Sequence, residues 1–285
     1  GVDGMAVLCE NRKLVPLDHP ASIHTVLFAF GYSYGDMPDG VEDPHARARY
    51  ETQAALIETL GERIGFQLVR AESNQALLHP DGLAYFDASH SGRFVPPMMG
   101  AARLVTDVLI GSNGEGGAST TPHGSHPLLD PHYSSAAVRV HNVHPVLTRS
   151  DKLRLLSDWE PAFDTLVVCH GGPDMPPDVL NCGRCEKCVR TMVGLVSVEA
   201  LHRFTVFPHD DVTPEMIDAI RIARAHHYLT LPDLTADLER IGRRDLLDAI
   251  QGRVARATEG RLAKTRRKWG RSLAKRLGRH QAHGK

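Results

Sequence analysis

The sequence contains no long hydrophobic run, no visible secretory leader and almost no net charge. No stretch of about eighteen uncharged apolar residues occurs, so we expect no membrane-spanning helix. Without a leader segment, we expect a cytoplasmic protein whose cysteines are not paired in disulfides. A length of 285 residues with 42% hydrophobic content is typical of one large α/β domain, or of such a domain with an appendage.

The net charge of -1 conceals two oppositely charged regions. Residues 253–285 hold twelve Lys or Arg residues against one acid, Glu259, which gives +11. The other 252 residues therefore carry 21 Lys or Arg against 33 Asp or Glu, which gives -12. Apolar residues recur in the tail near helical spacing, which is typical of a basic amphipathic helix that binds RNA, an anionic surface or an acidic partner. A disordered tail is the alternative, because glycines interrupt it.

Four of the five cysteines are spaced as metal ligands. Cys182, Cys185 and Cys188 have C-x-x-C-x-x-C spacing at the start of a predicted helix, which brings three sulfurs within reach of one ion. Cys169 ends an apolar run, 165–169, and can supply the fourth ligand. Four thiolates in a closed tetrahedron form the usual structural zinc site. An iron–sulfur cluster, disulfides and free thiols are the alternatives, while the fifth cysteine fits a core helix.

Strands and helices alternate along the first part of the chain. Apolar runs predict buried strands at 25–30, 66–69, 107–110, 138–143 and 165–169. Helical spacing predicts helices at 5–14, 50–64, 98–105 and 151–156, with Gly65 as a stop. This alternation predicts an α/β fold with an open parallel sheet, helices on both faces, and one cleft beyond the strand ends. After the cysteines the pattern is helical, with helices beginning near Thr213 and Pro232.

The order of these segments resembles the PP-loop ATP pyrophosphatases, and among them the 7-cyano-7-deazaguanine synthases of the queuosine pathway. The features that carry the resemblance are a Gly-x-Asp loop before a helix, a later Gly-Ser turn, the basic segment Thr148–Lys152 and the cysteine run. Gly1-Val2-Asp3-Gly4 is similar to the last four positions of the family's Ser-Gly-Gly-x-Asp-Ser loop. The resemblance covers roughly residues 1–195 and implies the HUP-like nucleotide-binding fold of that family.

The chain departs from the family at the loop itself. It begins inside the motif, so we expect a fragment of a longer protein whose preceding residues carry a strand and Ser-Gly. That strand is normally central, and omitting it would leave neighbouring strands unpaired and the sheet with a gap. The family's final serine is Gly4 here, which removes one hydroxyl donor to phosphate.

The resemblance implies that the protein binds ATP and Mg²⁺. The ATP-binding residues that it implies are Gly1, Val2, Asp3, Gly4, Phe30, Gly111 and Ser112. Backbone N–H groups at a helix start bind phosphate well, and Asp3 would orient the loop or help to hold Mg²⁺. Without the resemblance, Asp3 fits an ordinary acidic helix cap.

Two further residues are catalytic candidates on the same resemblance. Lys152, with Arg149, would neutralise charge as pyrophosphate leaves, although the segment also fits a plain capped helix start. Asp130 takes the place of the family's acid near the substrate. His123, His126 and His132 lie near Asp130 and suggest a second metal site, with surface or substrate-loop histidines as the alternative among 17 histidines.

The sequence predicts four regions: a nucleotide-binding domain at 1–168, a Cys₄ zinc knuckle at 169–195, a helical region at 196–252 and the basic tail at 253–285. The first functional hypothesis is an AMP-forming C–N ligase that adenylates a carboxylate or amide of an unidentified small molecule and releases pyrophosphate. The second is a catalytically degenerate, zinc-containing module that binds nucleic acid or a protein partner through basic residues.

Overall fold

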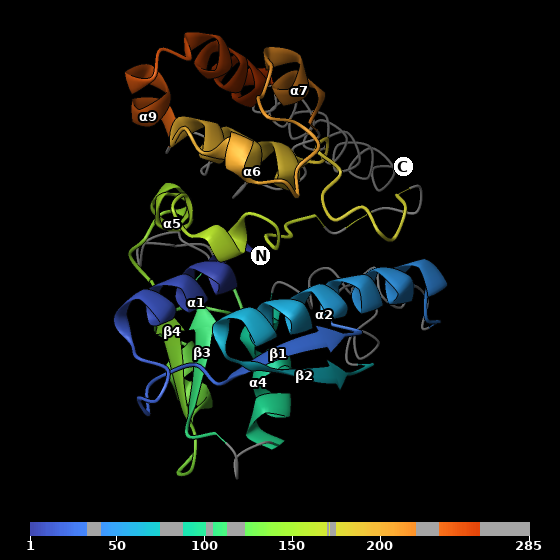
Figure 1. Ribbon diagram of the computed structural model, residues 1–285, viewed down its shortest axis with the longest axis vertical. Coiled ribbons are helices and arrows are strands. Elements are labelled where there is room, and N and C mark those ends of the chain that lie inside the picture. Colours follow the sequence, from blue (N-terminus) through green and yellow to red (C-terminus); the bar gives the residue numbers. More distant parts are fainter. Residues whose placement is uncertain are drawn as a thin grey trace, which may run out of the picture. The chain divides into compact units, whose positions relative to one another are not determined.

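A computed structural model describes residues 1–32, 41–74, 88–100, 105–112, 123–169, 171, 175–220 and 234–256 of the chain (Figure 1). The chain divides into two compact units, Gly1–Asp211 and Val212–Lys285. Most of the predicted basic tail, from residue 257 onward, lies outside the described residues. In the part of the chain that the structure describes, no helix has the length and hydrophobicity to cross a membrane.

Two small parallel sheets carry the strands of the first unit. Strand β1 (Thr25–Phe30) pairs with β2 (Gln67–Glu72), and β3 (Asp107–Gly111) pairs with β4 (Arg139–Val143). These four positions and their parallel direction were predicted from the sequence. Among the described residues the two pairs remain separate, so the single open sheet with helices on both faces is not confirmed. The strands are also less buried than their apolar runs predicted, because β1 is mostly half-buried and β2 is mostly exposed.

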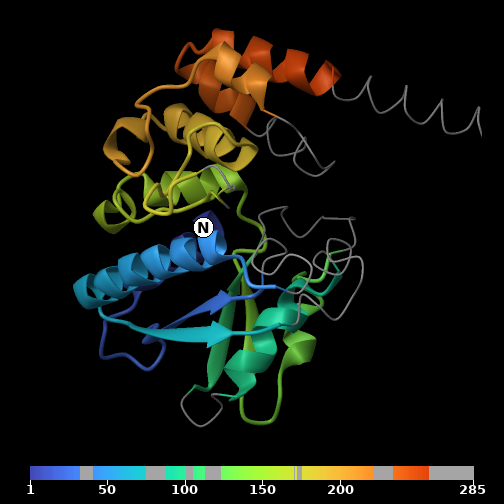
Figure 2. The same cartoon turned by 90° about the vertical axis from the view of Figure 1, so that its right-hand side faces the viewer.

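Three helices pack on these strands (Figures 1 and 2). α2 (Pro44–Ile64) lies along β1 and β2; Asp43 caps its start, and the predicted stop Gly65 ends it. α4 (His90–Gly100) contributes Val95 to an apolar core with Val108, Val138 and Val140 of the second sheet. α1 (Val2–Leu14) packs beside the end of β3.

The predicted strand at 165–169 is wrong. The segment is buried but has no strand partner, because the side chain of Asn181 takes the place of a neighbouring strand. The Asn181 Oδ1 atom accepts hydrogen bonds from the N–H groups of Val168 and Cys169 at 2.9 and 3.2 Å, and its Nδ2 donates to the Leu166 carbonyl at 2.9 Å. Buried backbone groups must find partners, and one amide side chain satisfies three of them. The hydrogen bonds to Asn181 still fix the position of the Cys169 backbone.

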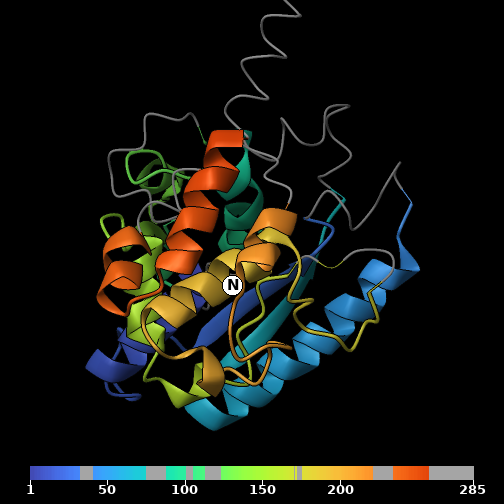
Figure 3. The ribbon, with the colours of Figure 1, turned by 90° about the horizontal axis from the view of Figure 1, so that it is seen from above.

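Two helices connect the sheet region to the cysteines (Figure 3). α5 (Arg149–Leu156) begins with a capping box in which Thr148 and Asp151 bond each other's backbone N–H groups. α5 packs against α1 on one side and α6 (Glu186–Ser197) on the other. Cys9, as predicted, lies in the core: its thiol is fully buried and donates to the Leu155 carbonyl at 3.5 Å.

The second unit is helical in its described part, as the sequence predicted. It contains α7 (Pro214–Ala219), α9 (Thr235–Arg240) and a helical stretch at 244–256. Two arginines tie these pieces together: Arg243 donates to the Val212 carbonyl at 2.7 Å, and Arg253 donates to the Ile220 carbonyl at 2.9 and 2.7 Å.

Candidate metal centre and anion site

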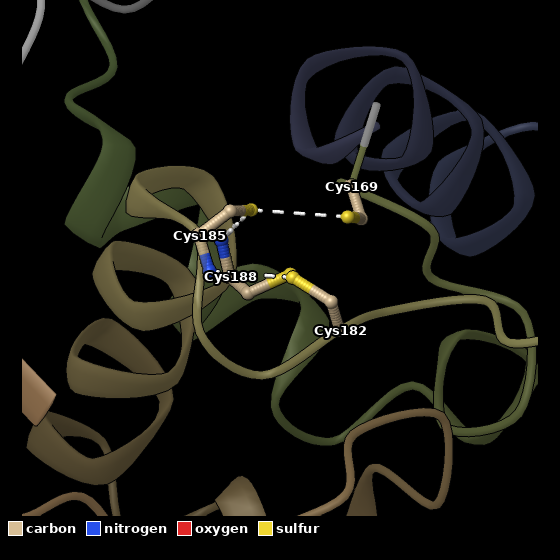
Figure 4. Close-up of side chains that lie close together, drawn as sticks. All are labelled: Cys169, Cys182, Cys185 and Cys188. Carbon is tan, nitrogen blue, oxygen red and sulfur yellow. Dashed lines mark hydrogen bonds between the residues drawn. The ribbon is translucent and has the colours of Figure 1, made fainter. Parts of the chain in front are cut away.

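Four cysteine sulfurs converge at the start of α6 (Figure 4). Cys182, Cys185 and Cys188 come from the turn and first residues of α6, and Cys169 comes from the segment fixed by Asn181. All four sulfurs lie within 4.8 Å of one another. The predicted ligand set is therefore assembled, and it can hold a metal ion such as zinc.

The distances between the sulfurs fit one tetrahedral ion. The Sγ atoms of Cys169 and Cys185 are 3.8 Å apart, and those of Cys182 and Cys188 are also 3.8 Å apart. Zn–S bonds of about 2.3 Å place the corners of a tetrahedron about 3.8 Å apart. A cluster of several irons would hold the sulfurs farther apart. A single ion is thus the better fit.

Backbone N–H groups point at the sulfurs and stabilise thiolates. The N–H of Gly171 donates to the Cys169 sulfur at 3.3 Å, that of Cys185 to Cys182 at 3.2 Å, and that of Cys188 to Cys185 at 3.5 Å. Gly183 makes the turn with a positive φ of 68°, and an added Cβ would lie 2.5 Å from Pro208. Outer contacts of this kind orient metal ligands.

Four thiolates need a cation to coexist. Thiol donors from Cys185 and then Cys188 lower the pKa of Cys169. Cys185 and Cys188 donate hydrogen bonds to the Cys169 sulfur. These bonds raise the pKa of Cys185 to about 12 and also raise the pKa of Cys188. One thiolate therefore forms readily in this cluster, while full deprotonation requires the metal.

A second convergence involves three residues far apart in the sequence. Lys152 donates from Nζ to Asp3 Oδ1 at 2.8 Å and also to the Ser112 carbonyl. Its side chain is fully buried, whereas the Asp3 side chain keeps 33% exposure. The Ser112 N–H donates to the Val143 carbonyl at 2.8 Å, which fixes the turn to the end of β4. The Gly1–Gly4 segment, the Gly111–Ser112 turn and α5 were each predicted separately. They meet at the ammonium group of Lys152.

Gly111 allows α1 to approach β3. A Cβ atom at this position would lie 2.8 Å from the Asp3 backbone carbon and 2.9 Å from its oxygen. Backbone at that distance cannot yield by a side-chain rotation, so a larger residue would push the start of α1 away.

The start of α1 is an uncapped helix N-terminus. Gly1 occupies the cap position and offers no side-chain hydrogen bond to the first turn. The first N–H groups of a helix have no partner within the helix, and the helix dipole makes this end positive. Such an end binds anions.

Three cationic side chains, those of Arg149, Lys187 and Arg190, lie close enough to Asp3 in the first turn of α1 for its charge to act on them. Burial, and then the charge of Arg190, lowers the pKa of Arg149 to about 10; Asp3 and Glu186 act in the opposite direction. Burial, followed by the charges of Arg149 and Arg190, lowers the pKa of Lys187 to about 8. Like charges repel, so their gathering in a desolvated place is typical of a site for an anion.

Asp130 lies inside the protein and anchors its own loop. It is fully buried, and its carboxylate accepts hydrogen bonds from Asn142 Nδ2 at 2.7 Å, Ser125 Oγ at 2.9 Å and the His126 N–H at 3.2 Å. These contacts suit a positioning role for the segment 123–133. Among the described residues, the four cysteines are the only group of three or more ligand side chains close enough to share an ion, so the histidines around Asp130 form no second metal site.

Phe30 packs in the core. Its side chain is 3% exposed, its ring lies 5.4 Å from that of Tyr50, and the Arg47 guanidinium sits 3.8 Å above its face. Its carbonyl accepts the Ser73 N–H at 3.1 Å. The two ring contacts belong to the β1–α2 interface, so the Phe30 side chain is already engaged there.

Two groups of site residues escaped the sequence reasoning. His90 lies where both Asp3 and Asp130 act on it, and its ring is 5.1 Å from that of His123. Its histidine neighbours were noticed because they flank Asp130, but His90 is remote in sequence. Lys187 lies between Cys185 and Cys188 and Arg190 follows two residues after Cys188, so basic residues among the metal ligands were the available signal.

Comparison with known proteins gives no match: no family model, no curated protein and no solved structure is similar to this chain. The PP-loop resemblance therefore rests on the sequence motifs alone.

Proposed function

We propose that this protein is an ATP-dependent enzyme that transfers AMP to a carboxylate or amide of a small molecule and releases pyrophosphate. The contact of Lys152 with Asp3 and the Ser112 carbonyl supports the proposal most strongly. The family resemblance assigns these three residues to one ATP site, and the chain brings them together across 149 and 40 positions of sequence.

The residues divide the work as follows. The uncapped N–H groups of α1 and the Arg149 guanidinium hold the phosphates. One carboxylate oxygen of Asp3 accepts from Lys152, and the other would help to hold Mg²⁺, since the Asp3 side chain keeps 33% exposure. Lys152 is fully buried, so it positions Asp3 and the Ser112 turn.

Adenylation is needed because a carboxylate has no good leaving group. Its oxygen leaves poorly, so direct attack by an amine or ammonia is slow. An oxygen of the acid attacks the α-phosphorus of ATP, the bond from that phosphorus to the bridging oxygen breaks, and pyrophosphate leaves. Mg²⁺, when bound, would neutralise charge on the leaving pyrophosphate. A nitrogen nucleophile then attacks the acyl carbon and displaces AMP. Positioning and charge stabilisation supply the catalysis.

The four cysteines take a structural role in this scheme. A closed set of four thiolates leaves zinc no open position for chemistry. The ion would instead hold Cys169 to the start of α6, and so fix the two chain segments that flank residues 170–181.

Nucleotide binding and turnover test the proposal separately. Titration calorimetry with MgATP should show binding that Asp3→Ala weakens at least tenfold. The exposed Asp18→Ala, which removes the same charge from the same unit, should leave binding unchanged. Pyrophosphate release should appear with one member of a panel of small acids that includes 7-carboxy-7-deazaguanine.

A binding module without turnover is the second candidate, and the burial of Lys152 favours it. An ammonium group with no exposed surface does not reach a phosphate in this conformation. MgATP or phosphate binding without pyrophosphate release for any acid would support the module and contradict the enzyme.

A further inference from the structure

We infer that helix α6 couples the metal centre to the anion site, so that metal bound at the four cysteines strengthens the binding of a phosphate-bearing ligand. The inference rests on the proposed function for the identity of the anion site. It adds Lys187 and Arg190 to that site, and it adds control of the site by the metal.

The two sites share the first turns of one helix. Cys185 caps α6, and its sulfur accepts the N–H of Cys188 at 3.5 Å. Lys187 lies between these two ligands in sequence, and Arg190 follows two residues after the second. A helix turn is rigid, so the metal ligands fix the direction in which these side chains leave the helix.

Arg149 ties α6 to the anion site on its other side. Its Nη2 donates to Thr191 Oγ1 at 2.9 Å, and Thr191 Oγ1 donates to the Lys187 carbonyl at 2.7 Å. Lys187, Arg190 and Thr191 lie three and four residues apart, which places them on one side of the helix. Arg149 therefore lies over the side of α6 that carries Lys187.

The same arginine opens α5, one turn before Lys152. The first turn of α5 is thus bound to α6 through Arg149, and to Asp3 and Ser112 through Lys152. This gives a continuous chain of contacts from the cysteines to the start of α1. Metal loss would remove the cap of α6 and release Lys187, Arg190 and the partner of Arg149 together.

Arg149 identifies the ligand as an anion. Its Nε atom is buried and has no hydrogen-bond partner among the described residues, and its Nη2 donates to a neutral hydroxyl. A buried guanidinium N–H without a partner is costly, and a phosphate oxygen would satisfy it together with the α1 N–H groups. Inorganic phosphate and nucleotide phosphates share this chemistry.

Binding to the zinc-loaded protein tests the role of α6 directly. Inorganic phosphate and MgATP are titrated calorimetrically at constant ionic strength against wild type, Lys187→Gln and Arg149→Gln. Each variant should weaken binding at least fivefold, and Lys187→Arg should restore most of it. Lys13→Gln, which removes a lysine paired with Asp158 at the far end of α1, should stay within twofold of wild type.

Coupling must be reciprocal, so the ligand should also protect the metal. The zinc affinity, measured by equilibrium competition with a chromophoric chelator, should rise about fivefold or more when phosphate or MgATP is saturating. Lys187→Gln should abolish this rise in zinc affinity. A rise with MgATP alone assigns the site to nucleotide phosphates, and a rise with both ligands assigns it to phosphate in general.

The failures are distinguishable. A wild-type protein that binds neither ligand overturns both the proposed function and this inference. Tight MgATP binding with the zinc affinity unchanged, or with Lys187→Gln equal to wild type, overturns the inference and leaves the proposed function standing.

Discussion

The metal centre and the anion site are built on helix starts that differ in their caps. α6 begins at Cys185, whose sulfur accepts the Cys188 N–H, while α1 begins at Gly1 with no side-chain cap. The positive end of a helix favours a negative charge in both cases. At α6 the protein supplies that charge as thiolates and so creates a cation site. At α1 the protein supplies one carboxylate, Asp3, which pairs with Lys152, and we propose that a ligand brings further negative charge.

The largest expected effect is the loss of the metal centre. Cys185→Ser should abolish zinc binding and greatly lower stability, because structural zinc contributes on the order of 10 kcal/mol of apparent binding energy. Cys9→Ser is the matched control: it alters another buried thiol, one that lies apart from the cluster, and should keep one zinc per chain. Metal analysis with thermal unfolding measures both. Stoichiometric zinc in the Cys185 variant would show that the four-cysteine centre is misassigned.

Removing either partner of the Lys152–Asp3 ion pair should destabilise the protein, but by different amounts. Asp3→Ala leaves a fully buried ammonium with the Ser112 carbonyl as its remaining acceptor among the described residues, and should lower the free energy of unfolding by about 3 kcal/mol. Lys152→Met leaves a carboxylate that is one-third exposed and can be hydrated, so the loss should be about 1 kcal/mol. Urea denaturation compares them. Equal losses, or the reverse order, would contradict the view of Lys152 as a buried positioning group.

The stability of the folded protein should depend on pH through His90. Burial, and then the charges of His123 and Arg93, lowers its pKa to about 4. Between pH 6.5 and 4, His90 is therefore protonated in the unfolded chain but not in the folded protein. Stability should be full above pH 6.5 and should fall by up to about 1.4 kcal/mol per pH unit as the pH drops toward 4.

Chemical denaturation at several pH values measures this slope. His90→Gln should flatten it, and the exposed His202→Gln should not. A slope that survives in the His90 variant would assign the effect to another group.

The smallest effect concerns the one hydroxyl that the loop lacks relative to the family motif. A Cβ atom at Gly4 would meet nothing within 4 Å, so Gly4→Ser fits without strain. The serine hydroxyl should tighten MgATP binding several-fold, or by about 1 kcal/mol. Gly4→Ala adds the same Cβ without the donor and should raise helix stability without that gain. Equal affinities in the two variants would place the phosphates away from Gly4.

Much of the local structure was predictable because periodicity and caps are local signals. The strands at 25–30, 107–110 and 138–143 and the stop at Gly65 follow from apolar runs and one glycine. The single sheet was not predictable, because pairing between strands depends on partners remote in sequence. The strand at 165–169 failed for a specific reason: Asn181 replaces a neighbouring strand with one side chain, and no pattern of apolar residues encodes that.

The two sites differ in the same way. Spacing gave three of the cysteines, which lie within seven residues, and Cys169 was added because it ends the apolar run 165–169. The contact of Asp3, Ser112 and Lys152 followed from the family resemblance, since nothing in their spacing links them. Arg149 was noticed as basic, but its neighbours Lys187 and Arg190 depend on the packing of α5 against α6. The role of Asp130 could not be read from sequence, because its burial is set by Asn142 and Ser125.

The most direct test of the central claim is isotope exchange between pyrophosphate and ATP, which reports reversible adenylation without the second nucleophile. In zinc-loaded protein, a small carboxylic acid should stimulate the exchange, Asp3→Ala should abolish it, and Asp18→Ala should retain it. Absence of exchange with every acid tried, in protein that binds MgATP and holds its zinc, would contradict the adenylating enzyme and leave a phosphate-binding module.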